Sequence, residues 1–166
     1  MNKYVFKPYN DIFPILFENE KNRLCKFLKR KYFIEHVGST AIPGASGKGI
    51  IDIMISTEKE EIPQIFKQLE EADYEYREMA SKPERLFFRI DIDDLIEEKR
   101  RYHVHLVPAK NNEWMETLKF RDYMLKHPEK VHEYNNLKIQ AVKESNQNGK
   151  IYRKIKEPFI KNIISQ

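Results

Sequence analysis

The sequence predicts an α+β domain in which a mixed β-sheet is flanked by helices and followed by a helical C-terminal part. Up to about residue 110, apolar residues alternate between helical spacing and short β-branched or aromatic runs, whereas from residue 111 the spacing is helical. The length of 166 residues suits one domain over 1–166, with the helical portion at about 111–166.

The first predicted elements are a helix, two strands and a second helix. Asn10 or Asp11 is a candidate N-cap for the first helix. The runs "YFIEHVGS" (32–39) and "GIIDIMIS" (49–56) have the composition of buried strands, and "KEEIPQIFKQLEEAD" (59–73) returns to helical spacing. The first helix is marked by apolar residues at helical spacing: Phe13, Leu16, Phe17, Leu24, Phe27 and Leu28.

Three further extended segments are expected to join the same sheet, at 74–79, 85–93 and 101–109. The helical part then breaks at His127 and Pro128. Near the end, Gly149 is interpreted as a helix stop and Pro158 as the start of a last helix.

Composition describes a well-solvated globular protein. Hydrophobic residues make up 40% and charged residues 34%, and the net charge of +4 favours anionic partners without a strong sign of nucleic-acid binding. The single cysteine, Cys25, excludes an intrachain disulfide and is interpreted as a small buried thiol. Because no apolar run approaches the roughly 20 residues of a membrane span, we expect a cytoplasmic protein without a membrane partner. Nothing in the sequence indicates an oligomeric state.

The stretch "HVGSTAIPGASGKGIIDIMI" (36–55) holds four of the five glycines but is not a P-loop. Counting back from Gly47 and Lys48 puts Ile42 where that motif needs its first glycine, and Gly49 stands where Ser or Thr should hold magnesium.

A different arrangement fits this stretch better. Gly38 allows a close backbone approach to a ligand, and the hydroxyls of Ser39 and Thr40 can donate to phosphate oxygens. Asp52 lies in a run of apolar residues, where a carboxylate is costly unless a cation or hydrogen-bond donors compensate it. We therefore predict a phosphate-binding turn beside a metal-binding aspartate.

The strand at 101–109 offers further ligands. Alternation places Arg101, His103 and His105 on one face, and histidine can ligate a transition metal, transfer a proton or contact phosphate. Hydrogen-bonded histidines on a half-exposed sheet are the structural alternative. Arg89 and Asp91 lie on the preceding strand, where we expect Asp91 to be solvated instead of a ligand.

The Gly-Ser to aspartate layout resembles the polymerase-β-type nucleotidyltransferases, and the closer resemblance is to the GrpB family. The motifs that carry it are "HVGSTAIPG", "IIDIMI", "LFFR", "RYHVHLV", "FRDYMLKHPE", "EYNNLK" and "YRKIKEPFI". The resemblance implies a nucleotidyltransferase-like mixed sheet, with Gly38 and Ser39 ending the first strand and Asp52 on the second. Lys48 matches the family's lysine, Gly49 replaces a proline, and Met54 stands where the superfamily has a second acid.

These observations predict a metal-dependent nucleotidyltransferase acting on a nucleoside triphosphate and an unknown acceptor. Its cofactor would be a divalent metal, magnesium or manganese, with zinc as the alternative. Two other functions stay open: a catalytically degenerate module that binds a nucleotide or phosphorylated metabolite, and a His-x-His metal-dependent hydrolase. The predicted catalytic and metal residues are Asp52, His103 and His105, and the predicted phosphate-binding residues are Gly38, Ser39, Thr40, Lys48, Arg89 and Arg101.

Overall fold

The computed structural model describes residues 6–146 and 148–166, which form a five-stranded mixed sheet with helices on both faces. The strand order is β1-β2-β5-β4-β3, in which β2 and β5 are parallel and the other neighbours are antiparallel. The strands are β1 (Phe33–Val37), β2 (Ile51–Thr57), β3 (Glu75–Tyr76), β4 (Leu86–Asp94) and β5 (Glu98–Pro108).

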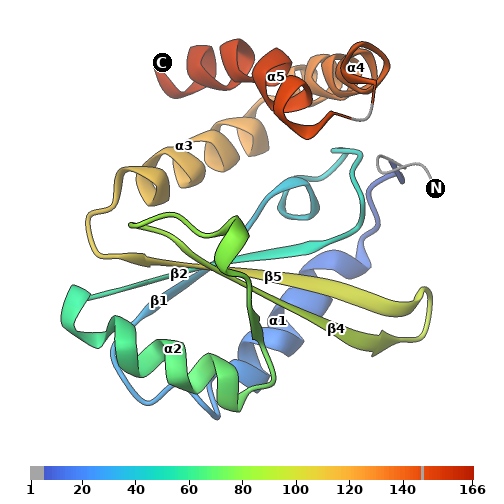
Figure 1. The fold of residues 1–166 in the computed structure, drawn as a ribbon. Coiled ribbons are helices and arrows are strands. Elements are labelled where there is room, and N and C mark those ends of the chain that lie inside the picture. Colours follow the sequence, from blue (N-terminus) through green and yellow to red (C-terminus); the bar gives the residue numbers. More distant parts are fainter. Residues whose placement is uncertain (1–5, 147) are drawn as a thin grey trace.

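Helices α1 and α2 cover one face of the sheet, and α3, α4 and α5 lie on the other side (Figure 1). The helix bounds are α1 (Ile12–Leu24), α2 (Ile62–Glu71), α3 (Asn112–Lys126), α4 (Pro128–Ser145) and α5 (Gly149–Ile164). The described residues also form three short 3₁₀ turns: η1 (Ser39–Ala41), η2 (Lys59–Glu61) and η3 (Glu78–Ala80). The predicted α+β architecture, with a mixed sheet and a helical C-terminal part, is confirmed.

The main core lies between α1, α2 and the sheet because the strands alternate as the sequence predicts. Ile53 and Ile55 of β2 and Val104 of β5 are fully buried on this face, against Leu24 of α1. The polar residues Asp52, His103 and His105 alternate with these residues and therefore face α3–α5.

The C-terminal helices have their own core and are tied to the loop before β2. Asn135 of α4 donates from Nδ2 to the carbonyl of Gly44 (2.8 Å) and accepts from the Ser46 backbone N–H (2.9 Å). The separate core of the C-terminal helices is an apolar cluster formed by Ile42, Ala45, Met124, Val131 and Tyr134. Among the described residues, no helix has both the length and the apolar character needed to cross a membrane.

Three local predictions were wrong. Gly149 begins α5 instead of ending a helix, because the Asn148 side chain accepts hydrogen bonds from the N–H groups of Lys150 and Ile151, and Pro158 lies inside α5. Cys25 is exposed because α1 ends at Leu24, and its Sγ lies 3.1 Å from the Tyr32 hydroxyl.

Candidate functional site

The turn after β1 is built around the carboxylate of Asp52. Val37 pairs with Asp52 across β1 and β2, which brings Gly38 over the aspartate. Gly38 has φ 74° and ψ −172°, a conformation that essentially only glycine adopts. A Cβ at this position would lie 2.5 Å from Asp52 Oδ2, so the glycine is required by both backbone and space.

Asp52, His103 and His105 meet on the sheet face that points toward α3–α5. Asp52 pairs with His103 in the parallel β2–β5 register. His103 Nδ1 lies 3.1 Å from Asp52 Oδ1, and His105 Nε2 lies 3.8 Å from the same oxygen. The Phe87 ring of β4 packs against both imidazoles, at centroid distances of 4.8 and 5.1 Å, and so fixes their orientation.

The histidines keep Asp52 ionised. Burial acts to raise the pKa of the Asp52 carboxyl, but the contacts from His103 and His105 outweigh it, and the pKa lies well below its usual range. Because a carboxylate only accepts, His103 donates to it from a protonated Nδ1 and has Nε2 left as its second ring nitrogen.

Thr40 is engaged in holding the turn. Its hydroxyl donates to the Ile50 carbonyl (3.0 Å) and accepts from His36 Nε2 (2.9 Å), and the residue is only 1% exposed. The His36 ring stacks on Phe17 at 4.7 Å, and burial lowers the pKa of His36 to about 4. The phosphate role of Thr40 stays a prediction that requires the hydroxyl to exchange these partners.

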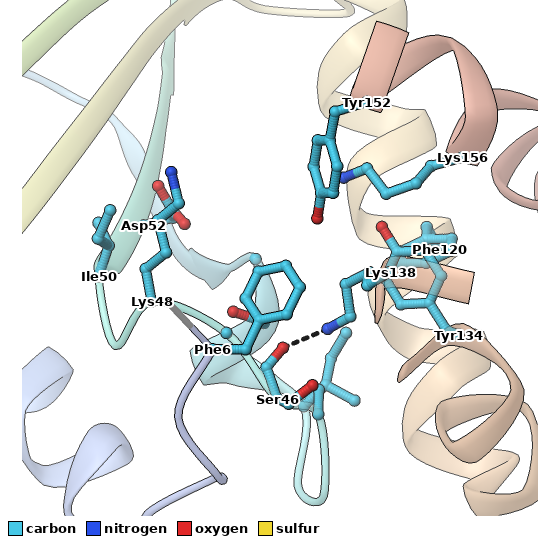
Figure 2. A pocket seen from close by; sticks show the side chains of 15 residues that line it. Phe6, Ser46, Lys48, Ile50, Asp52, Phe120, Tyr134, Lys138, Tyr152 and Lys156 are labelled. Carbon is cyan, nitrogen blue, oxygen red and sulfur yellow. Dashed lines mark hydrogen bonds between the residues drawn. The ribbon is translucent and has the colours of Figure 1, made fainter. Parts of the chain in front are cut away.

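A cavity of about 290 Å³ opens between this turn and the C-terminal helices (Figure 2). The sheet side supplies Gly38, Ser39, Lys48 and Asp52, and the view shows Lys48 beside Asp52, across the cavity from the lysines of α4 and α5. The remaining lining residues are Phe6, Ile42, Ala45, Ser46, Gly47, Ile50, Phe120, Tyr134, Lys138, Tyr152 and Lys156.

Lys138 and Lys156 were missed by the sequence analysis. Lys138 is 4% exposed and donates from Nζ to the Ser46 carbonyl, and the Lys156 ammonium lies 4.3 Å from the Tyr152 ring centroid. Burial, reinforced by the other lysine's charge, lowers the pKa of Lys138 to about 8. Burial and then the charges of Arg153 and Lys48 lower the pKa of Lys156 to about 8.

A sequence signal for these lysines exists. Each follows a tyrosine by four residues, in "YNNLK" (134–138) and "YRKIK" (152–156), which places the tyrosine and lysine on one helix face. Both pairs lie in motifs that carry the family resemblance, and α4 packs against α5. Two Tyr-x₃-Lys pairs on neighbouring helices thus form one basic wall.

Two predicted phosphate ligands lie away from this cavity. Arg89 Nη2 is 3.6 Å from Glu75, and Arg101 makes a two-pronged ion pair with Asp91 at 2.8 and 2.9 Å. Arg101 lines a separate cavity of about 280 Å³, which shares only Lys48 and Ile50 with the first. Asp91 is exposed, as the sequence analysis expected.

The donor set does not fit a preformed metal centre. Within residues 6–146 and 148–166, no group of three or more His, Cys, Asp or Glu side chains is arranged to hold a metal ion. Met54, at the place of a second acid, is 2% exposed. Hard divalent cations need several oxygen ligands, and here the cavity supplies one carboxylate.

Comparisons with solved structures define the class of fold. The chain superposes on Cid1, a poly(U) polymerase, in complex with its short product ApU, with a TM-score of 0.54 and 9% identity, covering 82% of this chain and 42% of that one. The crystal structure of conserved protein GrpB from Enterococcus faecalis superposes with a TM-score of 0.77 and 27% identity, covering 97% of this chain and 95% of that one. The fold is therefore nucleotidyltransferase-like.

Sequence comparisons then give the family. The family described as "GrpB protein" matches residues 3–166, and the chain belongs to it. UPF0157 protein YqkA of Bacillus subtilis is 31% identical over 92% of this chain, which spans only 44% of YqkA. Glutamate-rich protein GrpB of Alkalihalophilus pseudofirmus is 28% identical over 91% of this chain and 88% of its own length.

Proposed function

We propose that the chain binds the phosphates of a nucleoside triphosphate in the cavity beside Asp52 and transfers a nucleotidyl group to an acceptor. The observation that supports this most is the charge of the cavity: Lys48, Lys138 and Lys156 line it together with one aspartate. Burying cationic side chains is unfavourable unless an anion or good hydrogen bonds compensate them. A polyphosphate supplies that compensation.

In this reaction the acceptor oxygen bonds to the α-phosphorus while the bond to pyrophosphate breaks. Gly38 and Ser39 would position the nucleotide, and the lysines would offset the phosphate charge. His103 would take the acceptor proton at Nε2, because Asp52 holds the opposite ring nitrogen, Nδ1.

The direct test is release of pyrophosphate from the common nucleoside triphosphates, with and without a cell extract as the source of acceptor. We expect release from at least one nucleotide, and its loss in His103→Gln. A divalent metal at Asp52 stays a prediction, so the assay is run with magnesium, with manganese and with EDTA. Absence of release under all conditions would overturn the transferase proposal.

A binding module without turnover is the second candidate, and Met54 in the place of an acid favours it. Calorimetry separates the two, since a module binds nucleotide without releasing pyrophosphate. No observation on the described residues favours the His-x-His hydrolase. His103 and His105 both approach Asp52 Oδ1, at 3.1 and 3.8 Å, but no group of three or more His, Cys, Asp or Glu side chains is arranged to hold a metal ion.

A further inference from the structure

We propose that lysines from the C-terminal helices take the place of divalent cations in this cleft, so that a polyphosphate binds without metal. This inference rests on the proposed function and concerns which groups of the same cavity neutralise the charge of its ligand. Three features support this inference: the acids near Asp52 are replaced or paired, Asp52 has partners within the protein, and Lys138 and Lys156 line the opposite side of the cavity.

Within the described part of the chain, the strand positions beside Asp52 carry either no acid or an acid that is already paired. On β2 the second acid is replaced by Met54, whose neighbour across β1 is Glu35. Glu35 accepts a hydrogen bond from Arg121 Nη1 at 2.6 Å, which ties it to α3. On the other side, the β5 neighbour of Asp52 is His103, and not an acid. Asp52 is therefore the single carboxylate that faces the cavity among its lining residues.

Both oxygens of the Asp52 carboxylate also have neighbours within the protein. One of its oxygens, Oδ1, is the atom that both histidines approach, at 3.1 and 3.8 Å. Oδ2 lies under Gly38, where even a methyl group has no room. A cation bridging Asp52 to a phosphate would have to displace the His103 contact or enter beneath the turn.

The opposite wall of the cavity, on α4 and α5, carries Lys138 and Lys156, whose positive charges have no acidic partner among the described residues. Across the described ranges, neither Lys138 nor Lys156 lies within 4.0 Å of a carboxylate oxygen. Their neighbours are instead the Ser46 carbonyl and the rings of Tyr134 and Tyr152. Tyr134 and Tyr152 are 8% and 7% exposed, so the lysines stand in an aromatic setting of low polarity, where an ammonium attracts phosphate more strongly than at the surface.

The two walls together give a division of roles. Asp52 already has a hydrogen-bond donor in His103 without a ligand, whereas Lys138 and Lys156 gain an acidic partner only when an anion enters. The cleft therefore selects a polyanion through α4 and α5, while magnesium-type bridging through the sheet has no complete ligand set.

The test is isothermal titration of inorganic tripolyphosphate and of ATP into the full chain, in EDTA and again with excess magnesium or manganese. We expect dissociation constants that agree within about twofold between EDTA and metal. Lys138→Met and Lys156→Met should each weaken binding by about tenfold or more, the loss typical of one charge-assisted contact. Asp52→Asn should leave the affinity in EDTA unchanged or raise it, because it removes a like charge.

Matched controls come from the same helices. Lys130→Met on α4 and Lys161→Met on α5 remove lysines that are paired with Glu133 and Glu157 at the surface, and they should leave binding unchanged. Circular dichroism confirms that each variant is folded. If Lys138→Met is not folded, Lys156→Met carries the same prediction.

The failures of the two proposals are distinguishable. Binding seen only with magnesium or manganese, and abolished by Asp52→Asn, would overturn the lysine proposal while it supports a metal-dependent nucleotide site. Absence of binding by both probes in every buffer would overturn the phosphate-binding cavity and with it the proposed function. Tripolyphosphate binding that Lys138→Met and Lys156→Met leave intact would place the anion elsewhere and also overturn the proposal.

Discussion

Replacing Gly38 by alanine should be far more damaging than replacing Gly44, and the difference measures how tightly the turn is built on Asp52. Both glycines have positive φ, 74° and 80°. At Gly44 the nearest atom to a new Cβ is Val131 Cγ1 at 3.7 Å, an ordinary contact. At Gly38 the new Cβ would lie 2.5 Å from Asp52 Oδ2 and 3.1 Å from Asp52 Cβ, so backbone or carboxylate must move.

The two costs can be estimated separately. The left-handed conformation costs an alanine about 1–2 kcal/mol, which is the expected loss for Gly44→Ala. For Gly38→Ala, the glycine-only conformation costs about 1–3 kcal/mol, and forcing a methyl group into a filled space adds about 1–3 kcal/mol. We therefore expect a loss of about 2–6 kcal/mol for Gly38→Ala.

Urea denaturation followed by circular dichroism gives both free energies of unfolding. The His103 and His105 ring resonances should move in Gly38→Ala, because Asp52 is displaced, and should stay in place in Gly44→Ala. Equal losses of stability in the two variants, with unmoved histidine resonances, would refute the view that the turn and Asp52 are packed as one unit.

Two further predictions test the cavity and its support. Lys138 and Lys156 have pKa values of about 8, and the groups around them are Lys48, Arg153, Asp52, Tyr134 and Tyr152. The affinity for tripolyphosphate should therefore fall as the pH rises through about 8, because the ammonium groups lose their protons. The free energy of unfolding should rise between about pH 8 and the ordinary lysine pKa of 10.5, because in that range the native chain binds fewer protons than the unfolded chain. A tripolyphosphate affinity that stays flat from about pH 7 to 9 would contradict the affinity prediction. Arg100→Met should cost about 3–5 kcal/mol, because it leaves the buried Asp94 without its 3.2 Å partner and breaks the 3.0 Å contact to the Gly49 carbonyl. Arg101→Met, which breaks an exposed pair with Asp91, should cost at most about 1 kcal/mol, and similar losses for the two variants in urea denaturation would count against the buried network.

Strand alternation made much of the sheet predictable. The period of two in "RYHVHLV" places His103 and His105 opposite Val104 and Leu106, and the β2–β5 register shows that the polar face is the one that carries Asp52. What the pattern does not contain is pairing between distant strands. The contact between Asp52 and His103 depends on β2 and β5 being neighbours, although 51 residues separate them in the chain.

The basic wall could not be identified from helical spacing alone. Lys138 lies on the buried stripe of α4, with Val131, Tyr134, Ala141 and Ser145, whereas Ile139 is 47% exposed. A lysine on a helix is ordinarily a solvent-facing residue, and only the packing of α4 beside α5 and over the Ser46 loop removes it from water. The error at Gly149 and Pro158 is of another kind, because the Asn148 cap determines the helix start more strongly than the glycine opposes it.

The most direct measurement is a crystal structure of the chain with a non-hydrolysable nucleoside triphosphate, grown in EDTA and grown again with manganese. We predict that the phosphates lie between Ser39, Lys138 and Lys156 in both crystals, with the α-phosphate nearest Asp52. Phosphate density at another surface, or in this cavity only when manganese bridges it to Asp52, would contradict a cleft in which lysines meet the charge of the ligand.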